Sequence, residues 1–249
     1  MSDVPKNHSP AKLDQPEVNP DALIEDLFGL NLKGLKTLRD LFVRPRVLFE
    51  SARVPDWNEA YTPTVRLAFS LITLFTVLSF FWAAEDGPFY QTLLAQTQEA
   101  NADNPNAPPA GEIVSSYFAA YSFVYPFAYM VVHGVLASLL FVWGKGTYWV
   151  VRVRLYFALL STALVFGVAS IAIMPLLQWE SLLVYTFFTL GFTFAVYWWT
   201  YARGMSGEAA LGKRVIGGGS TALMMIIGDL GVAVITSLAS AFWTDRLIG

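Results

Sequence analysis

The segment 117–143, YFAAYSFVYPFAYMVVHGVLASLLFVW, constrains the fold of this chain more than any other stretch. It contains no Asp, Glu, Lys or Arg, and it is long enough for a helix to cross the roughly 30 Å hydrocarbon core of a bilayer. His133 is its only acidic or basic side chain. Because an ionisable group is costly in hydrocarbon and usually faces protein or water, we expect His133 to face another helix and treat it as a candidate functional residue.

The composition of the whole chain agrees with a membrane location. Hydrophobic residues make up 55% of the 249 residues and charged residues 14%, well below the roughly one quarter of charged residues in a soluble domain. We therefore predict an all-α membrane helix bundle. The net charge of −3 offers no basic excess for nucleic-acid binding, and a chain without cysteine has neither disulfides nor thiolate metal ligands.

Four further apolar segments are long enough to span a bilayer, which predicts five transmembrane helices. The predicted spans are 65–84, 117–143, 155–177, 182–201 and 219–243. They form a membrane domain of residues 63–249, in which 85–112 has acidic residues but no Lys or Arg and is predicted to be an external loop. Before this domain, residues 1–20 are polar and proline-rich without the apolar run of a signal peptide, which predicts a disordered tail, and 21–62 are predicted to form amphipathic helices.

The distribution of basic residues predicts the orientation of the bundle. Of the 16 Lys and Arg residues, 15 lie on the side of the predicted spans that holds the N-terminus, and only Arg246 lies on the other side. By the positive-inside rule, the N-terminus is then cytoplasmic and the C-terminus lies outside. Seven of the eight tryptophans also fall near predicted span ends, where a ring with an apolar body and a polar N–H is favoured.

Two amphipathic segments precede the first span. Residues 21–30 and 32–43 each place apolar residues on one helical face, and in 32–43 the opposite face is basic. Pro45 ends this pattern, and a second short helix is predicted over 47–52 with Pro45 near its first turn. The segment 32–43 either lies among anionic headgroups or packs beneath the bundle, and both alternatives remain open. The candidate interfacial basic face consists of Lys33, Lys36, Arg39, Arg44 and Arg46.

Asp229 is the candidate partner of His133. At 1.5 Å per residue, His133 lies about 15 Å from the inner end of its span, and Asp229 lies about 12–18 Å from the inner start of the last span. If these spans are neighbours, the carboxylate can accept a hydrogen bond from the imidazole, which lowers the cost of burying both groups. Gly134, Gly228 and Gly231 would allow the backbones to approach closely. The pair His133 and Asp229 is therefore the candidate intramembrane polar pair.

Less specific explanations exist for both residues. A lone histidine in a span is commonly satisfied by a hydroxyl or a backbone carbonyl, and Asp229 could bond instead to the hydroxyl of Thr73 or Thr76. The two residues then make structural contacts only. If the pair instead couples to the movement of protons or ions, it carries a function.

Two other patterns have both a structural and a functional interpretation. Tyr117, Tyr121, Tyr125 and Tyr129 recur every four residues, which places them on one face of the predicted helix. This stripe packs against another helix or lines a groove for a lipid or quinone. Residues 217–220, Gly-Gly-Gly-Ser, either start the last span flexibly or present backbone N–H groups to a phosphate headgroup.

Several segments resemble the Yip family of polytopic membrane proteins, which are named for their interaction with Ypt/Rab GTPases. The matching features are the histidine of the second span, GKGTYWVVRVRLY at 144–156, WWTYARGMSGEAALGKRV at 198–215 and RPRVLF at 44–49. The DLYGP-type motif that eukaryotic members carry before the first span is replaced by DLFGL at 26–30, much earlier in the chain. The resemblance therefore implies a bacterial-type member in the cytoplasmic (inner) membrane rather than a Rab-binding protein, and it implies no catalytic residues.

No pattern in the chain indicates an enzyme. It lacks a Walker loop, an H-E-x-x-H motif and a G-x-S-x-G motif, and we expect no cofactor, no metal site and no nucleic-acid partner. The sequence favours a non-enzymatic scaffold, adaptor or assembly partner that contacts the lipid bilayer, anionic headgroups at the cytoplasmic face and a membrane-protein partner or a second copy. The alternative is a small transporter or lipid-handling protein that uses His133 and Asp229.

Overall fold

The computed structural model describes residues 32–80, 87–104, 106–140, 142–144, 146–173, 182–205 and 211–248, and this part of the chain contains helices and no strand. The helices are α2 (Leu32–Val43), α3 (Pro45–Ser51), α4 (Trp57–Ala60), α5 (Thr64–Phe80), α6 (Pro88–Asn101), α7 (Ala110–Leu139), α8 (Trp149–Ile173), α9 (Leu182–Gly204) and α10 (Leu211–Ile248). The predicted all-α bundle is confirmed for these residues. The predictions for residues 1–20 and 21–30, and for the outer ends of the first and third spans, lie outside the described residues.

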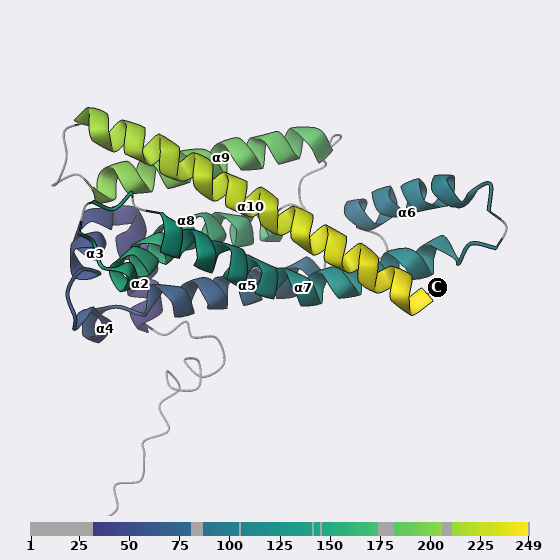
Figure 1. Ribbon diagram of the computed structural model, residues 1–249, viewed down its shortest axis with the longest axis horizontal. Helices are drawn as coiled ribbons and strands as arrows, with labels where there is room; N and C mark the ends of the chain where they lie inside the picture. Colours follow the sequence, from purple (N-terminus) through teal and green to yellow (C-terminus); the bar gives the residue numbers. More distant parts are fainter. Residues whose placement is uncertain are drawn as a thin grey trace, which may run out of the picture.

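The long helices α5, α7, α8, α9 and α10 form the bundle, and α2, α3 and α4 lie across one end of it (Figure 1). Helix α10 packs along α7 and α9, while α5 packs along α8. At the opposite end, α6 projects past the bundle and packs on the first turns of α7 (Figure 1). We call the end covered by α2–α4 the inner end, and the end that carries α6 the outer end.

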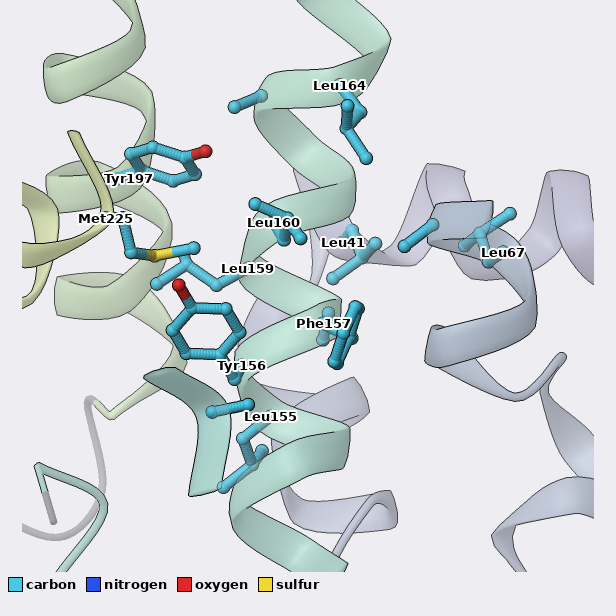
Figure 2. Packing of buried hydrophobic residues seen from close by; sticks show 14 of the residues in the cluster. Leu41, Leu67, Leu155, Tyr156, Phe157, Leu159, Leu160, Leu164, Tyr197 and Met225 are labelled. Carbon is cyan, nitrogen blue, oxygen red and sulfur yellow. The ribbon is translucent and has the colours of Figure 1, made fainter. Parts of the chain in front are cut away.

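Helix α8 forms the centre of the hydrophobic core. Every residue from 155 to 164 is buried, as expected for a helix that is apolar around its whole circumference. The hydroxyls of Ser161 and Thr162 donate to carbonyls of α8 itself, at 2.7 and 2.6 Å, so they add no unsatisfied group to the core. Figure 2 shows α8 between Tyr197 and Met225 on one side and Leu41 and Leu67 on the other.

Among the described residues, three helical stretches are long and apolar enough to cross a membrane: Ala110–Leu139, Trp149–Ile171 and Leu211–Arg246. A ridge of large apolar side chains is exposed along α7 at four-residue spacing: Phe123, Phe127, Val131, Val135 and Leu139. Such a ridge is unfavourable in water but is the ordinary surface of a helix in lipid. Together these features identify a multi-pass helical membrane protein.

The second predicted span begins and ends earlier than expected. Helix α7 starts at Ala110 rather than at residue 117, and Glu112 in its first turn is favoured by the positive end of the helix dipole. The helix ends at Leu139, because Leu140 has an extended backbone. Trp143, predicted to mark the interface, is instead fully buried against Phe49, with ring centroids 5.9 Å apart.

The glycines 217–219 lie inside α10, which starts at Leu211 rather than near residue 219. Their N–H groups are therefore part of the helix, and the phosphate-headgroup interpretation of 217–220 is wrong. A Cβ atom on Gly218 would lie 2.7 Å from Cδ1 of Trp198 and 3.1 Å from its carbonyl oxygen. Glycine costs about 1 kcal/mol relative to alanine in a helix interior, and the close packing of α10 on α9 offsets that cost.

Helices α2 and α3 pack beneath the bundle through their apolar sides. Leu41, Leu48 and Phe49 are buried in the main core. Helix α2 has the predicted bounds, and α3 has Pro45 in its first turn as expected. Packing beneath the bundle, one of the two alternatives for 32–43, therefore holds for the buried side of α2, while contact of its exposed side with anionic headgroups stays a prediction.

Two arginines from the inner ends of the bundle hold these short helices. Arg203 of α9 donates to the carbonyls of the last two residues of α2, at 3.5 and 3.4 Å. Arg154 of α8 donates to the carbonyls of Ala52 and Val54, just after α3, at 3.4 and 3.2 Å. The last carbonyls of a helix lack intrahelical partners and carry partial negative charge, so both arginines stabilise the helix ends that they contact.

Asp40 links α2 to the segment before α5. Its carboxylate is buried and accepts hydrogen bonds from Arg39, at 2.8 Å, and from the Tyr61 hydroxyl, at 3.1 Å. Burial opposes ionisation of Asp40, but the hydrogen bonds from Arg39 and Tyr61 and the positive charges of Arg39 and Arg44 outweigh it, so the pKa of Asp40 lies below its ordinary value.

We expect the packing of α2 to weaken on acidification. Because the pKa of Asp40 is lower in the folded chain than in the unfolded chain, ionised Asp40 stabilises the fold above about pH 3.9, and this contribution is lost as the pH falls through the lowered pKa. Amide hydrogen exchange in α2, corrected for its intrinsic pH dependence, should therefore accelerate below about pH 4.

The matched variants are Asp40→Asn and, for the exposed carboxylate that pairs with Arg46, Glu50→Gln. Asp40→Asn should already exchange faster near neutral pH and lose most of the acid response, whereas Glu50→Gln should behave as the wild type. An unchanged acid response in Asp40→Asn would contradict the assignment.

Candidate functional site

His133 and Asp229 are in direct contact inside the bundle. His133 lies on α7 and its side chain is 0% exposed, while Asp229 lies on α10 with a side chain 22% exposed. The distance from Nε2 of the histidine to Oδ1 of the aspartate is 3.1 Å. The hydroxyls of Thr73 and Thr76, the alternative partners, donate instead to carbonyls of their own helix.

Three tyrosine hydroxyls complete the contacts of this pair. Tyr129 donates to Oδ1 of Asp229 at 3.1 Å, and Tyr197 donates to Oδ2 at 3.3 Å. The Tyr156 hydroxyl lies 2.7 Å from Nδ1 of His133. Since α7, α8, α9 and α10 each contribute at least one side chain, the site joins four helices. We call the following five residues the polar cluster: Tyr129, His133, Tyr156, Tyr197 and Asp229.

The contacts define the roles of the acceptor and donor atoms. Three groups converge on the two oxygens of Asp229, which suits an ionised carboxylate because it only accepts hydrogen bonds. Two proton arrangements satisfy His133. A neutral ring donates from Nε2 and accepts the Tyr156 hydroxyl at Nδ1, whereas an imidazolium donates from both nitrogens. In either case both ring nitrogens are hydrogen-bonded.

Gly228, the residue before Asp229, allows α10 to approach α7 at this level. A Cβ atom built on Gly228 would lie 2.6 Å from Cδ1 of Leu136 and 3.0 Å from Cε1 of His133. The expected role of glycine in close approach is therefore correct for Gly228. It is wrong for Gly134 and Gly231, where an added Cβ would have no neighbour within 4 Å among the described residues.

The sequence did not reveal Tyr156 and Tyr197 as members of the site. They lie seven residues from the inner ends of α8 and α9, and His133 lies six residues from the inner end of α7, which places all three about 9–11 Å along their helices. The depth criterion applied to the predicted spans would not have selected these two tyrosines, because Tyr156 lies one residue from the inner start of span 155–177 and Tyr197 four residues from the inner end of span 182–201, depths of only about 2 and 6 Å. The sequence also does not show how α8 and α9 are rotated about their axes. This rotation turns the Tyr156 hydroxyl toward His133 and the Tyr197 hydroxyl toward Asp229.

The tyrosine stripe of α7 is mainly a packing surface. Its ring centroids follow one another at 6.1 Å from Tyr117 to Tyr121, 5.7 Å to Tyr125 and 5.6 Å to Tyr129. Tyr125 also stacks on Phe75 of α5 at 5.6 Å. The interpretation that this stripe packs against another helix therefore agrees with the structure, and its last member enters the polar cluster.

The candidate basic face lies at the inner end, apart from the polar cluster. All five of its side chains are exposed: Lys33, Lys36, Arg39, Arg44 and Arg46. Some of these side chains make contacts within the chain. Arg46 forms an ion pair with Glu50 at 2.7 Å. Lys36 donates to the Ala60 carbonyl at 3.1 Å and lies over the ring of Tyr61 at 4.7 Å.

The fold and the polar cluster together define a helical membrane protein whose helices are joined by a buried histidine–aspartate–tyrosine site. Within the described ranges, no group of three His, Cys, Asp or Glu residues could hold a metal ion. No family model, curated protein or solved structure matches this chain. Its function must therefore be inferred from the residues of the chain itself.

Proposed function

We propose that this chain is a five-span, non-enzymatic scaffold or assembly partner of the bacterial cytoplasmic membrane, and that the polar cluster locks its helices together. One observation carries this proposal. Every member of the polar cluster finds a hydrogen-bond partner inside the cluster, at distances of 2.7–3.3 Å. A saturated site of this kind stabilises one helix arrangement, because each buried polar group would be costly if its partner moved away.

The five-span topology and the bacterial-type Yip family membership are parts of the same proposal. Support for five spans comes from α5, α7, α8, α9 and α10, which run alternately between the inner and outer ends. Support for a cytoplasmic inner end comes from the basic residues gathered there. Family membership rests on the resemblance of the segments 44–49, 144–156 and 198–215.

The exposed side of α2 and α3 is the surface that we assign to contacts outside the chain. Leu35, Val43 and Val47 are exposed there among the basic side chains, with exposures of 58%, 57% and 46%. Apolar side chains flanked by Lys and Arg suit a leaflet of anionic lipids, with the charges at the headgroups. A membrane-protein partner or a second copy would bind beside this surface, along the lipid-facing helices.

A second candidate function follows from the partial exposure of Asp229. Its carboxylate is 22% exposed although it lies within the bundle, whereas His133 is fully enclosed. A carboxylate that can be reached from one side could exchange a proton or contact a polar substrate. This supports a small transporter or lipid-handling protein as the alternative.

Conservative variants of the pair distinguish the two functions. Wild type, His133→Gln and Asp229→Asn would be reconstituted in liposomes with an entrapped pH-sensitive dye, and proton flux would be recorded after a pH jump with and without a membrane potential. We expect all three to match protein-free liposomes, and partners retained in a mild detergent to be the same for all three. A wild-type flux that Asp229→Asn abolishes, with the protein still folded, would show that the transporter is the correct function.

A further inference from the structure

A cavity of about 380 Å³ lies at the outer end of the bundle, far along α7 and α10 from the polar cluster. It is open on one side and is lined by α6, by Pro108 and the first turns of α7, and by the last turns of α10. Its volume falls within the range of roughly 300–1,000 Å³ typical of small-molecule sites. The residues that matter for its chemistry are Thr97, Val114, Tyr117, Ala241, Thr244 and Asp245.

Thr244 is an unusual polar group in this wall. It is only 6% exposed, and none of the described residues offers its Oγ1 atom a hydrogen-bond partner. Thr97, across the cavity, shows the common alternative, because its hydroxyl donates to the carbonyl four residues earlier at 2.8 Å. A buried hydroxyl without a partner costs about 1–3 kcal/mol, and a ligand that hydrogen-bonds to Thr244 after its side chain rotates toward the cavity would remove that cost.

The charge around the cavity is negative. Asp245 contributes a carboxylate to its lining. Glu99, Asp103 and Glu112, all exposed, lie on α6, on the loop after it and on the start of α7. The nearest basic residue along α10, Arg246, lies over the ring of Phe242 at 5.2 Å. An apolar cavity with a carboxylate in its lining favours a ligand with a hydrocarbon body and a cationic head.

We propose that this cavity binds one alkyl chain and the primary ammonium group of an amphiphile. The chain occupies the apolar part beside Val114 and Ala241. The ammonium group donates to the Asp245 carboxylate and, after rotation of the Thr244 side chain toward the cavity, to the Thr244 hydroxyl, because both oxygens can accept a hydrogen bond. The same chemistry occurs in a bilayer lipid with an ethanolamine headgroup and in a free alkylamine. This inference is independent of the proposed scaffold function.

The test uses photoreactive probes on the full chain in phosphatidylglycerol nanodiscs, which contain no amine. Decylamine and decanol, each carrying a diazirine in the chain, would be crosslinked and mapped by mass spectrometry. We expect saturable labelling of the cavity by the amine, and about tenfold weaker labelling by the alcohol, because the alcohol has no positive charge to pair with the Asp245 carboxylate. Added phosphatidylethanolamine should compete if the natural ligand is a bilayer lipid, and only free alkylamine should compete otherwise.

Matched variants connect the labelling to the cavity. Ala241→Phe should fill the cavity and remove the labelling, whereas Ala233→Phe, an exposed alanine of α10 that is not among the lining residues, should leave it unchanged. Asp245→Asn and Thr244→Val keep the volume, and each should weaken labelling by the amine more than labelling by the alcohol. They test the site even if Ala241→Phe fails to fold. The proposal is overturned if the amine labels the Ala241→Phe and Ala233→Phe variants equally, or if amine and alcohol label the wild type equally.

Discussion

Replacing Asp229 with leucine should lower the free energy of unfolding by about 3 kcal/mol. The substitution removes the acceptor of Tyr129, Tyr197 and the histidine Nε2 atom, three groups that lie within 3.3 Å of its carboxylate. Each lost hydrogen bond between membrane helices is worth about 1 kcal/mol, because the unfolded chain in the bilayer also finds partners for its polar groups. Steric trapping in bicelles measures this quantity without leaving the bilayer.

Two comparisons show whether the loss comes from the polar cluster. Asp245→Leu changes an exposed aspartate on the same helix and should alter stability by less than about 0.5 kcal/mol. Asp229→Asn keeps the shape and one acceptor oxygen, so we expect a loss between those of the two leucine variants. If Asp229→Leu were no more destabilising than Asp245→Leu, the polar cluster would not lock the helices.

The double variant His133→Leu/Asp229→Leu should be less destabilised than the sum of the two single variants. Each single substitution leaves one side of the hydrogen bond between His133 and Asp229 without its partner, whereas the double substitution removes both sides at once. We expect a coupling energy of about 1–2 kcal/mol. The hydrogen bond between the Tyr156 hydroxyl and His133 is lost in His133→Leu and in the double variant alike, so it does not contribute to the coupling energy.

Replacing Gly228 with leucine should lower the free energy of unfolding by a similar amount, because the larger side chain would overlap its neighbours. Its Cβ would meet Leu136 at 2.6 Å and the His133 ring at 3.0 Å, so α10 must move away from α7 or the ring must rotate out of its contacts. Overpacking of this kind costs about 1–3 kcal/mol. Separation of the helices would also lengthen the hydrogen bond between His133 and Asp229. The total loss should therefore reach about 3 kcal/mol.

Gly231 provides the matched control on the same helix, one turn further along. Nothing among the described residues lies within 4 Å of a Cβ built there. Gly231→Leu should therefore leave stability unchanged or raise it by up to about 1 kcal/mol, because leucine has the higher helix propensity. Equal losses in Gly228→Leu and Gly231→Leu would mean that α7 and α10 do not approach closely at His133.

Much of the helical framework can be predicted from the sequence, because the bilayer restricts the kinds of segment that can cross it. A backbone in hydrocarbon must satisfy its own hydrogen bonds, so a long apolar run predicts a helix. The stretch within 117–143 and the short helix 32–43 follow from such patterns. Helix ends were predicted less well. Residues 110–116 and 211–218 continue their helices beyond the apolar runs, since a helix can extend past the hydrocarbon wherever its residues permit.

By itself the sequence determined that the chain is a bundle of apolar helices and that His133 and Asp229 are ionisable side chains within apolar segments, where each is expected to contact another polar group. An ionisable side chain in an apolar run is conspicuous without any knowledge of its neighbours. Only the tertiary structure decided that α8 is the central helix and that Tyr156 and Tyr197 complete the polar cluster. The physical reason is that a tyrosine is ordinary at any depth in a membrane helix. Whether its hydroxyl meets a carboxylate or lipid depends on which helices are neighbours and how each is rotated about its axis.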